Sequence, residues 1–134
     1  MELDAHASPI SKHRLWTGRI LILLVVLFLL FDSAGKFMKP VQVVDACARL
    51  GWPSNLLTVL GSILFICTVL YAIPSTCILG ATLLTGYLGG AVAIHLRAGS
   101  PPFETVFPII LGLLVWAGLL LRDERVGRLI TCQT

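Results

Sequence analysis

Residues 20–31 read ILILLVVLFLLF, an unbroken apolar stretch that lies between Arg19 and Asp32. A helix that spans a bilayer needs about 20 mostly apolar residues, and this stretch reaches that length together with its neighbours. Three further apolar stretches of similar length follow it. The four expected spans cover residues 16–37, 54–72, 74–96 and 106–121. The sequence therefore predicts an all-α integral membrane protein, a four-helix bundle with up-down topology.

The composition supports the same class. Hydrophobic residues make up 57% of the 134 residues and charged residues only 13%, whereas ordinary soluble proteins carry about 25% charged residues. The transmembrane domain is expected to take up residues 15–122, which leaves residues 1–14 and 123–134 as tails. A cleaved signal peptide is the alternative for the N-terminal region, because Lys12 and Arg14 precede the apolar stretch and Ser33-Ala34-Gly35 resembles a cleavage site. The pattern continues as a membrane segment, so we interpret it as the first span.

The net charge of +3 comes from basic residues at the ends of the spans, where they set orientation, and it does not indicate nucleic-acid binding. If the N-terminus is cytoplasmic, four spans return the C-terminus to the same side. Six of the ten basic residues then face the cytoplasm: Lys12, Arg14, Arg19, Arg122, Arg125 and Arg128. We therefore expect a multi-pass protein of the bacterial inner membrane with both termini in the cytoplasm.

The stretch between the first two spans, residues 39–53 (KPVQVVDACARLGWP), has helical periodicity. One face would carry Val43, Cys47 and Leu50, and the opposite face Gln42, Asp45 and Arg49. Gly51 and Pro53 end the pattern, and Trp52 is suited to the membrane interface. The sequence predicts a short amphipathic helix that lies in the outer interface.

Residues 84–99 (LTGYLGGAVAIHLRAG) contain a second informative pattern. At 100° per residue, one narrow stripe of small side chains forms: Thr82, Gly86, Gly90 and Ala93. Small residues let helices approach closely in lipid, so the stripe predicts helix packing, within the chain in preference to a second copy. Arg97 continues this stripe, whereas His95 points almost oppositely, so the two basic residues do not form one surface.

Asp32 would lie inside the hydrocarbon region, where ionisable groups are candidates for function. Lys36, one turn later, compensates only part of the cost of burial, so we expect a further partner. His95 and Arg97 are the candidates, and Glu104 completes the proposed cluster. The cluster is either a site that binds a ligand and exchanges protons with it, or an ion-pair network that fastens the helices. The structural explanation is the more economical one, since the sequence alone shows no cavity.

The sequence contains no phosphate-binding loop and no nucleophile with a positioned base. The four cysteines have no metal-ligand spacing, and only His95 is placed for haem ligation. We therefore expect no metal site, no evident cofactor and no catalytic activity of the chain on its own, and catalytic residues stay unknown. A solute transporter is disfavoured because neither an inverted repeat nor a broken helix is visible.

Residues 80–99 (GATLLTGYLGGAVAIHLRAG), followed by residues 102–123 (PFETVFPIILGLLVWAGLLLRD), resemble the DoxX-like family of small bacterial four-span membrane proteins. The stretches FDSAGKFMKP and LGWP resemble the family pattern at the end of the first span and the start of the second. The resemblance extends over nearly the whole chain after the N-terminal tail.

The family resemblance implies a link to membrane redox processes, because its namesake resembles a subunit of a quinone-reducing oxidoreductase. We therefore expect an accessory or anchoring subunit that contacts the lipid bilayer and a membrane redox subunit, with quinone as the candidate ligand. The alternative is a non-catalytic assembly or lipid-interacting protein with a purely structural polar network. A homo-oligomer is compatible with both hypotheses.

Overall fold

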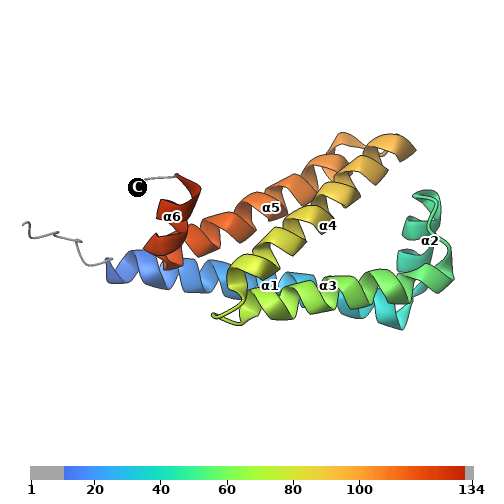
Figure 1. Ribbon diagram of the computed structural model, residues 1–134. Coiled ribbons are helices and arrows are strands. Elements are labelled where there is room, and N and C mark those ends of the chain that lie inside the picture. The colour runs from blue at the N-terminus through green and yellow to red at the C-terminus, as the bar shows by residue number, and fades with distance from the viewer. Residues whose placement is uncertain (1–10, 132–134) are drawn as a thin grey trace, which may run out of the picture.

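The computed structural model describes residues 11–131 as an all-helical chain (Figure 1). Its elements are α1 (Lys12–Met38), α2 (Val41–Arg49), η1 (Ser54–Leu56), α3 (Leu57–Ala72), α4 (Cys77–Ala98), α5 (Pro102–Arg122) and α6 (Glu124–Ile130). Four segments are long and apolar enough to cross a membrane: α1, η1 with α3, α4 and α5. The predicted four-helix membrane bundle is thus confirmed.

Each long helix packs against two others and forms a ring in the order α1, α3, α4, α5. Successive helices run in opposite directions, which is the expected up-down topology. The pair α1 and α3, here called the first arm, and the pair α4 and α5, the second arm, separate toward the end of the bundle where α2 lies (Figure 1). We call this the α2 end and the opposite end, where α1 begins and α5 stops, the termini end.

Glycines allow the helices of the ring to pack closely where they cross. A Cβ atom added to Gly80 in α4 would lie 2.2 Å from the backbone nitrogen of Tyr71 in α3. One added to Gly118 in α5 would lie 2.8 Å from Cγ1 of Ile22 in α1. No side chain fits at such distances, so these glycines permit the close approach that stabilises helix pairs in lipid.

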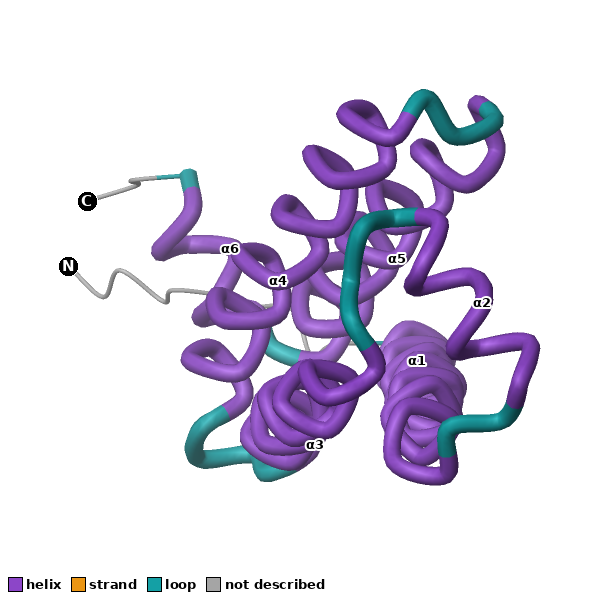
Figure 2. Tube along the Cα trace, turned by 90° about the vertical axis from the view of Figure 1, so that its right-hand side faces the viewer, coloured by secondary structure: helices purple, strands orange, loops and turns teal. Residues whose placement is uncertain are grey.

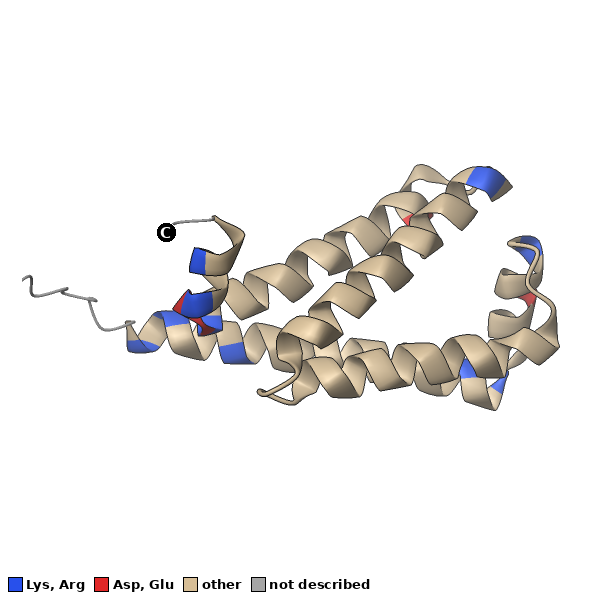
Figure 3. Cartoon of the chain, in the orientation of Figure 1, with Lys and Arg blue, Asp and Glu red and all other residues tan. Residues whose placement is uncertain are grey.

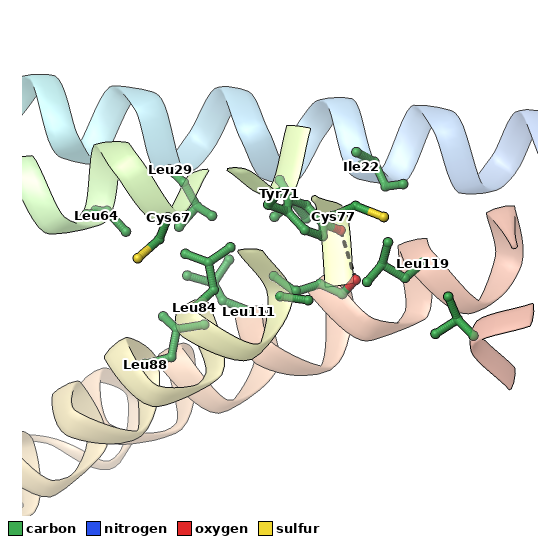
Figure 4. Packing of buried hydrophobic residues seen from close by; sticks show 14 residues of the cluster. Ile22, Leu29, Leu64, Cys67, Tyr71, Cys77, Leu84, Leu88, Leu111 and Leu119 are labelled. Atoms are coloured by element: carbon green, nitrogen blue, oxygen red, sulfur yellow. Dashed lines mark hydrogen bonds between the residues drawn. The ribbon is translucent and has the colours of Figure 1, made fainter. Parts of the chain in front are cut away.

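Interhelical hydrogen bonds satisfy polar side chains of the membrane helices, as the absence of water in a bilayer requires. The hydroxyl of Ser33 in α1 donates to the carbonyl oxygen of Gly61 in α3 at 2.8 Å. The indole Nε1 of Trp116 in α5 donates to the Oγ1 of Thr85 in α4, also at 2.8 Å. Figure 4 shows the apolar core of the bundle, with side chains from α1, α3, α4 and α5 interleaved.

The stripe of Thr82, Gly86, Gly90 and Ala93 does not pack within the chain: all four residues are exposed. Cβ atoms added to Gly86 or Gly90 would meet no atom within 4 Å. The prediction of intramolecular packing is therefore wrong. The buried face of α4 is instead formed by larger side chains such as Leu84 and Leu88, and α4 diverges from the first arm where the stripe lies (Figure 1).

The short helix predicted between the first two spans is α2, with Pro40 as its N-cap. Its predicted apolar face is partly covered, whereas the predicted polar residues Gln42, Asp45 and Arg49 are exposed. Left-handed backbone conformations flank it, with φ of 51° at Lys39 and 85° at Gly51. Gly51 is suited to this conformation because it lacks a side chain.

The helix bounds differ from the expected spans at turns. Pro74 lies in the link between α3 and α4, so α4 begins only at Cys77. In contrast, α5 begins at Pro102, which is suited to a first helical position. The C-terminal tail contains α6, a helix that was not predicted from the sequence. The carboxylate of Asp123 accepts from the backbone N–H of Arg125 at the start of α6, and Val126 is buried.

Candidate functional site

A cavity of about 510 Å³ lies between the arms toward the α2 end. It is lined by residues from all four long helices, from α2 and from the segment that follows α2. Most of its wall is apolar and aromatic, and it includes Phe28, Trp52, Tyr87 and Phe107. Cavities of this size and character hold small organic ligands when a few polar groups fix the orientation.

Three ionisable side chains that the sequence analysis singled out line this cavity: Asp32, Lys36 and His95. The Nζ of Lys36 lies 2.6 Å from Oδ2 of Asp32, one helical turn earlier. The Lys36 side chain is only 13% exposed, whereas that of Asp32 is 45% exposed. The aliphatic part of the Lys36 side chain lies against Gly61 of α3. The lysine is thus held against the first arm, and the carboxylate is the more accessible member of the pair.

His95 lies near the end of α4, where the turn at Gly99 brings it beside the start of α5. Its Nδ1 lies 3.0 Å from Oγ of Ser100 and 3.7 Å from Oε2 of Glu104. These contacts fix the ring at the edge of the cavity. The link between α4 and α5 therefore brings together His95 and Glu104, two members of the expected cluster.

A second cavity, of about 390 Å³, adjoins the first at the α2 end. Arg49, Ser100 and Glu104 line it, and Cys47, Leu50 and His95 line both cavities. His95 therefore separates a mostly apolar cavity between the helices from a more polar one between α2 and the α4–α5 turn.

Arg97 is exposed and lines neither of the two cavities. Within residues 11–131, Asp32 forms an ion pair with Lys36 alone. The further ion-pair partner that was expected from α4 is not found there. Helical periodicity explains the difference. Arg97 follows His95 by two residues, so its side chain leaves the helix about 200° away from the cavity side.

The aromatic residues of the wall and Cys47 were not predicted as site residues. Cys47 could have been found, because it belongs to the apolar face of the amphipathic α2. Partial burial raises the pKa of the Cys47 thiol, the nearby Lys36 ammonium lowers it, and the Asp32 carboxylate raises it further. The aromatic residues gave no such signal, since they look like ordinary lipid-facing or core residues in a membrane span.

The first cavity thus offers an ammonium and an imidazole that can donate hydrogen bonds, and a carboxylate that can accept them. No group of three or more His, Cys, Asp or Glu side chains able to hold a metal occurs in the described part of the chain. The arrangement fits a ligand with an apolar ring and polar oxygens.

The model of the DoxX-like family matches residues 20–118. The chain belongs to the DoxX-like family. The matched region includes every residue that lines the two cavities, so the site of this DoxX-like protein lies wholly inside the family region. No curated protein and no solved structure matches the chain.

Proposed function

We propose that this DoxX-like protein is an accessory or anchoring subunit of a membrane redox system and binds a quinone-class ligand in the cavity between its arms. The observation that carries the proposal is the placement of the Asp32–Lys36 pair and His95 on the wall of an otherwise apolar cavity. Ionisable groups at membrane depth are costly and typically mark functional sites.

The residues present fit a quinone. The ring would lie among Phe28, Trp52 and Phe107, because aromatic faces stack favourably. Lys36 and His95 would donate hydrogen bonds to the carbonyl oxygens, and Asp32 would accept one from a hydroxyl of the reduced form. A bound quinone supplies a carrier of two electrons and two protons. The chain itself offers proton-exchanging groups, and a partner redox subunit would supply or take the electrons.

The alternative is a non-catalytic assembly or lipid-interacting protein whose polar network is structural. A network that fastens the bundle would join its separated parts. Both ion pairs found within residues 11–131 are local instead: Asp32 and Lys36 lie on one helix, and His95 and Glu104 flank one turn of the second arm. This pattern favours a ligand site, because neither pair holds the arms together.

We propose a bacterial inner-membrane location with both termini in the cytoplasm. Basic residues are present at both ends of the bundle (Figure 3). The termini end carries Lys12, Arg14, Arg19, Arg122, Arg125 and Arg128, and the α2 end carries Lys36, Lys39, Arg49 and Arg97. The positive-inside rule then orients the termini end toward the cytoplasm, so the cavity lies in the outer half of the membrane.

The first test is native mass spectrometry of the protein extracted from its own membranes in mild detergent. A quinone-mass adduct, or a redox subunit bound in fixed proportion, is the expected result. Phospholipid alone, or a bare homo-oligomer, would instead support the structural alternative.

A binding titration tests the site directly. Duroquinone, a fully substituted benzoquinone without a tail, should quench the fluorescence of Trp52 in lipid nanodiscs, because Trp52 lines the cavity. A Trp52→Phe variant is the control that shows how much quenching comes from the other two tryptophans. Equal quenching in both proteins would contradict binding in this cavity.

A further inference from the structure

The side of the cavity between α1 and α5 is closed, whereas the side between α3 and α4 is not. On the side between α1 and α5, the rings of Phe28 and Phe107 meet edge to face, with centroids 5.5 Å apart. Seen from the α2 end, α2 lies beside α1, on the side of the bundle away from α3 and α4 (Figure 2). The aromatic pair and the flanking helix thus close the cavity on the α1–α5 side.

The side between α3 and α4 has no such closure. Two contacts show which side of α4 faces each neighbouring helix. Gly80 lies against α3, and Thr85 accepts a hydrogen bond from α5. Helical periodicity places Tyr87 and Gly90 nearer the α3 side, and Gly86 on the outer face of α4 between the two sides. Both Gly86 and Gly90 line the cavity, and both are exposed. The opposite helix α3 contributes only Leu60 to the wall.

Helix packing within the chain does not account for these two glycines. Glycine is unfavourable in a helix relative to alanine, and at Gly80 and Gly118 a close crossing explains its presence. At Gly86 and Gly90, an added Cβ would meet nothing within 4 Å. The missing side chains leave open space at the edge of the cavity.

We propose that the cavity opens sideways into the bilayer between α3 and α4, and that Gly86 and Gly90 form the sill over which the hydrocarbon tail of the ligand passes. This inference rests on the proposed function. A cavity of about 510 Å³ has the size of a site for one small molecule, so a long isoprenoid tail extends beyond it. An apolar tail is more stable in lipid than in water, and an opening onto lipid lets it stay there while the ring meets Asp32 and Lys36.

The test compares two quinones and two variants in nanodiscs. Duroquinone has no tail, and decylubiquinone carries a ten-carbon tail on a fully substituted ring. The variant Gly86→Leu/Gly90→Leu fills the sill, and the open surroundings of both glycines favour normal folding. The matched control is Gly89→Leu, because Gly89 is also exposed and unobstructed but lines neither of the two cavities.

We expect the sill variant to lose affinity for decylubiquinone about tenfold or more beyond any loss of affinity for duroquinone, a difference that corresponds to a displaced tail. The Gly89 control should bind both probes normally. Unchanged affinity of the sill variant for both quinones, or an equal loss for both, would overturn the sideways opening.

Failure of the proposed function has a different signature, in which the wild type binds neither quinone. Native mass spectrometry of the same samples tests the other occupant of this surface, a second copy of the chain. A wild-type dimer that becomes monomeric in the sill variant, with both quinone affinities unchanged, would assign the glycines to a subunit interface and overturn the proposal.

Discussion

The hydroxyl of Tyr71 in α3 donates to the backbone carbonyl oxygen of Val115 in α5 at 2.8 Å, diagonally across the ring of helices (Figure 4). Both residues are fully buried. The same tyrosine receives the close crossing of Gly80 through its backbone and lies beside Gly118 through its hydroxyl. Tyr71 therefore joins three of the four membrane helices at one point near the termini end, away from the cavity.

Tyr71→Phe should lower stability and leave ligand binding intact. It removes a buried hydrogen bond with little change in shape, so we expect a loss of about 0.5–1.5 kcal/mol in the free energy of unfolding. Unfolding with a denaturing detergent measures this change. Tyr87→Phe is the control, since the hydroxyl of Tyr87 makes no hydrogen bond within the described structure. An equal effect of both substitutions would contradict the structural role of the Tyr71 bond.

Gly80→Ala should be strongly destabilising. The added methyl group would lie 2.2 Å from a backbone nitrogen that cannot move independently of its helix, and overpacking of this kind costs about 1–3 kcal/mol or more. Thermal unfolding and the yield of monodisperse protein measure the effect. Gly89→Ala is the matched substitution on the same helix and should be neutral or slightly stabilising, because its surroundings are open. Comparable yields of the two variants would contradict the crossing.

Asp32→Asn should leave the protein folded and weaken binding of the reduced ligand by about 10- to 100-fold, the range for loss of one charge-assisted hydrogen bond. The measurement is the same titration with durohydroquinone, whose hydroxyl would donate to Asp32, together with the thermal unfolding temperature as a check of the fold. Arg97→Gln is the control, because Arg97 lines neither of the two cavities. Wholesale misfolding of Asp32→Asn would instead support a structural network.

The reactivity of Cys47 should depend on pH in a direction set by its neighbours. Burial raises the pKa of this thiol, so less reactive thiolate is present at neutral pH than in a free cysteine. In a variant without the other three cysteines, the rate of maleimide labelling should therefore keep rising at pH values where a free thiol has already levelled off.

Substitutions of Lys36 and Asp32, the two charged neighbours of Cys47, should change its labelling rate in opposite directions. Lys36→Met removes a cation that lowers the pKa of Cys47, so labelling at a fixed pH should slow down. Asp32→Asn removes an anion that raises it, so labelling should speed up. Changes in the opposite directions would contradict the placement of Cys47 beside this pair.

The fold could be predicted from the sequence because apolar length, charges and turn residues each act locally. Residues 20–31 are sufficient to indicate a membrane span, and Pro74 is sufficient to end a helix. The amphipathic pattern of α2 likewise depends only on its own residues. Such features need no knowledge of which helix lies next to which.

The details that depend on neighbours could not be predicted. Periodicity shows that Gly86 and Gly90 share a face with Thr82, but it does not show whether that face meets another helix. The crossings fall at Gly80 and Gly118 instead, and only the arrangement of the ring reveals this. Asp32, Lys36 and His95 were singled out from the sequence and do line one cavity, while their role as a site stays a prediction. The sequence did not indicate that the arms separate to create the cavity.

The separation of the arms has a consequence for the membrane itself. The helices pack closely at the termini end, through crossings such as that of Gly118 with α1. They lie apart at the α2 end. The bundle is therefore wider at the α2 end than at the termini end (Figure 1). We expect a membrane that curves outward on the α2 side to accommodate this shape with less strain than a flat one.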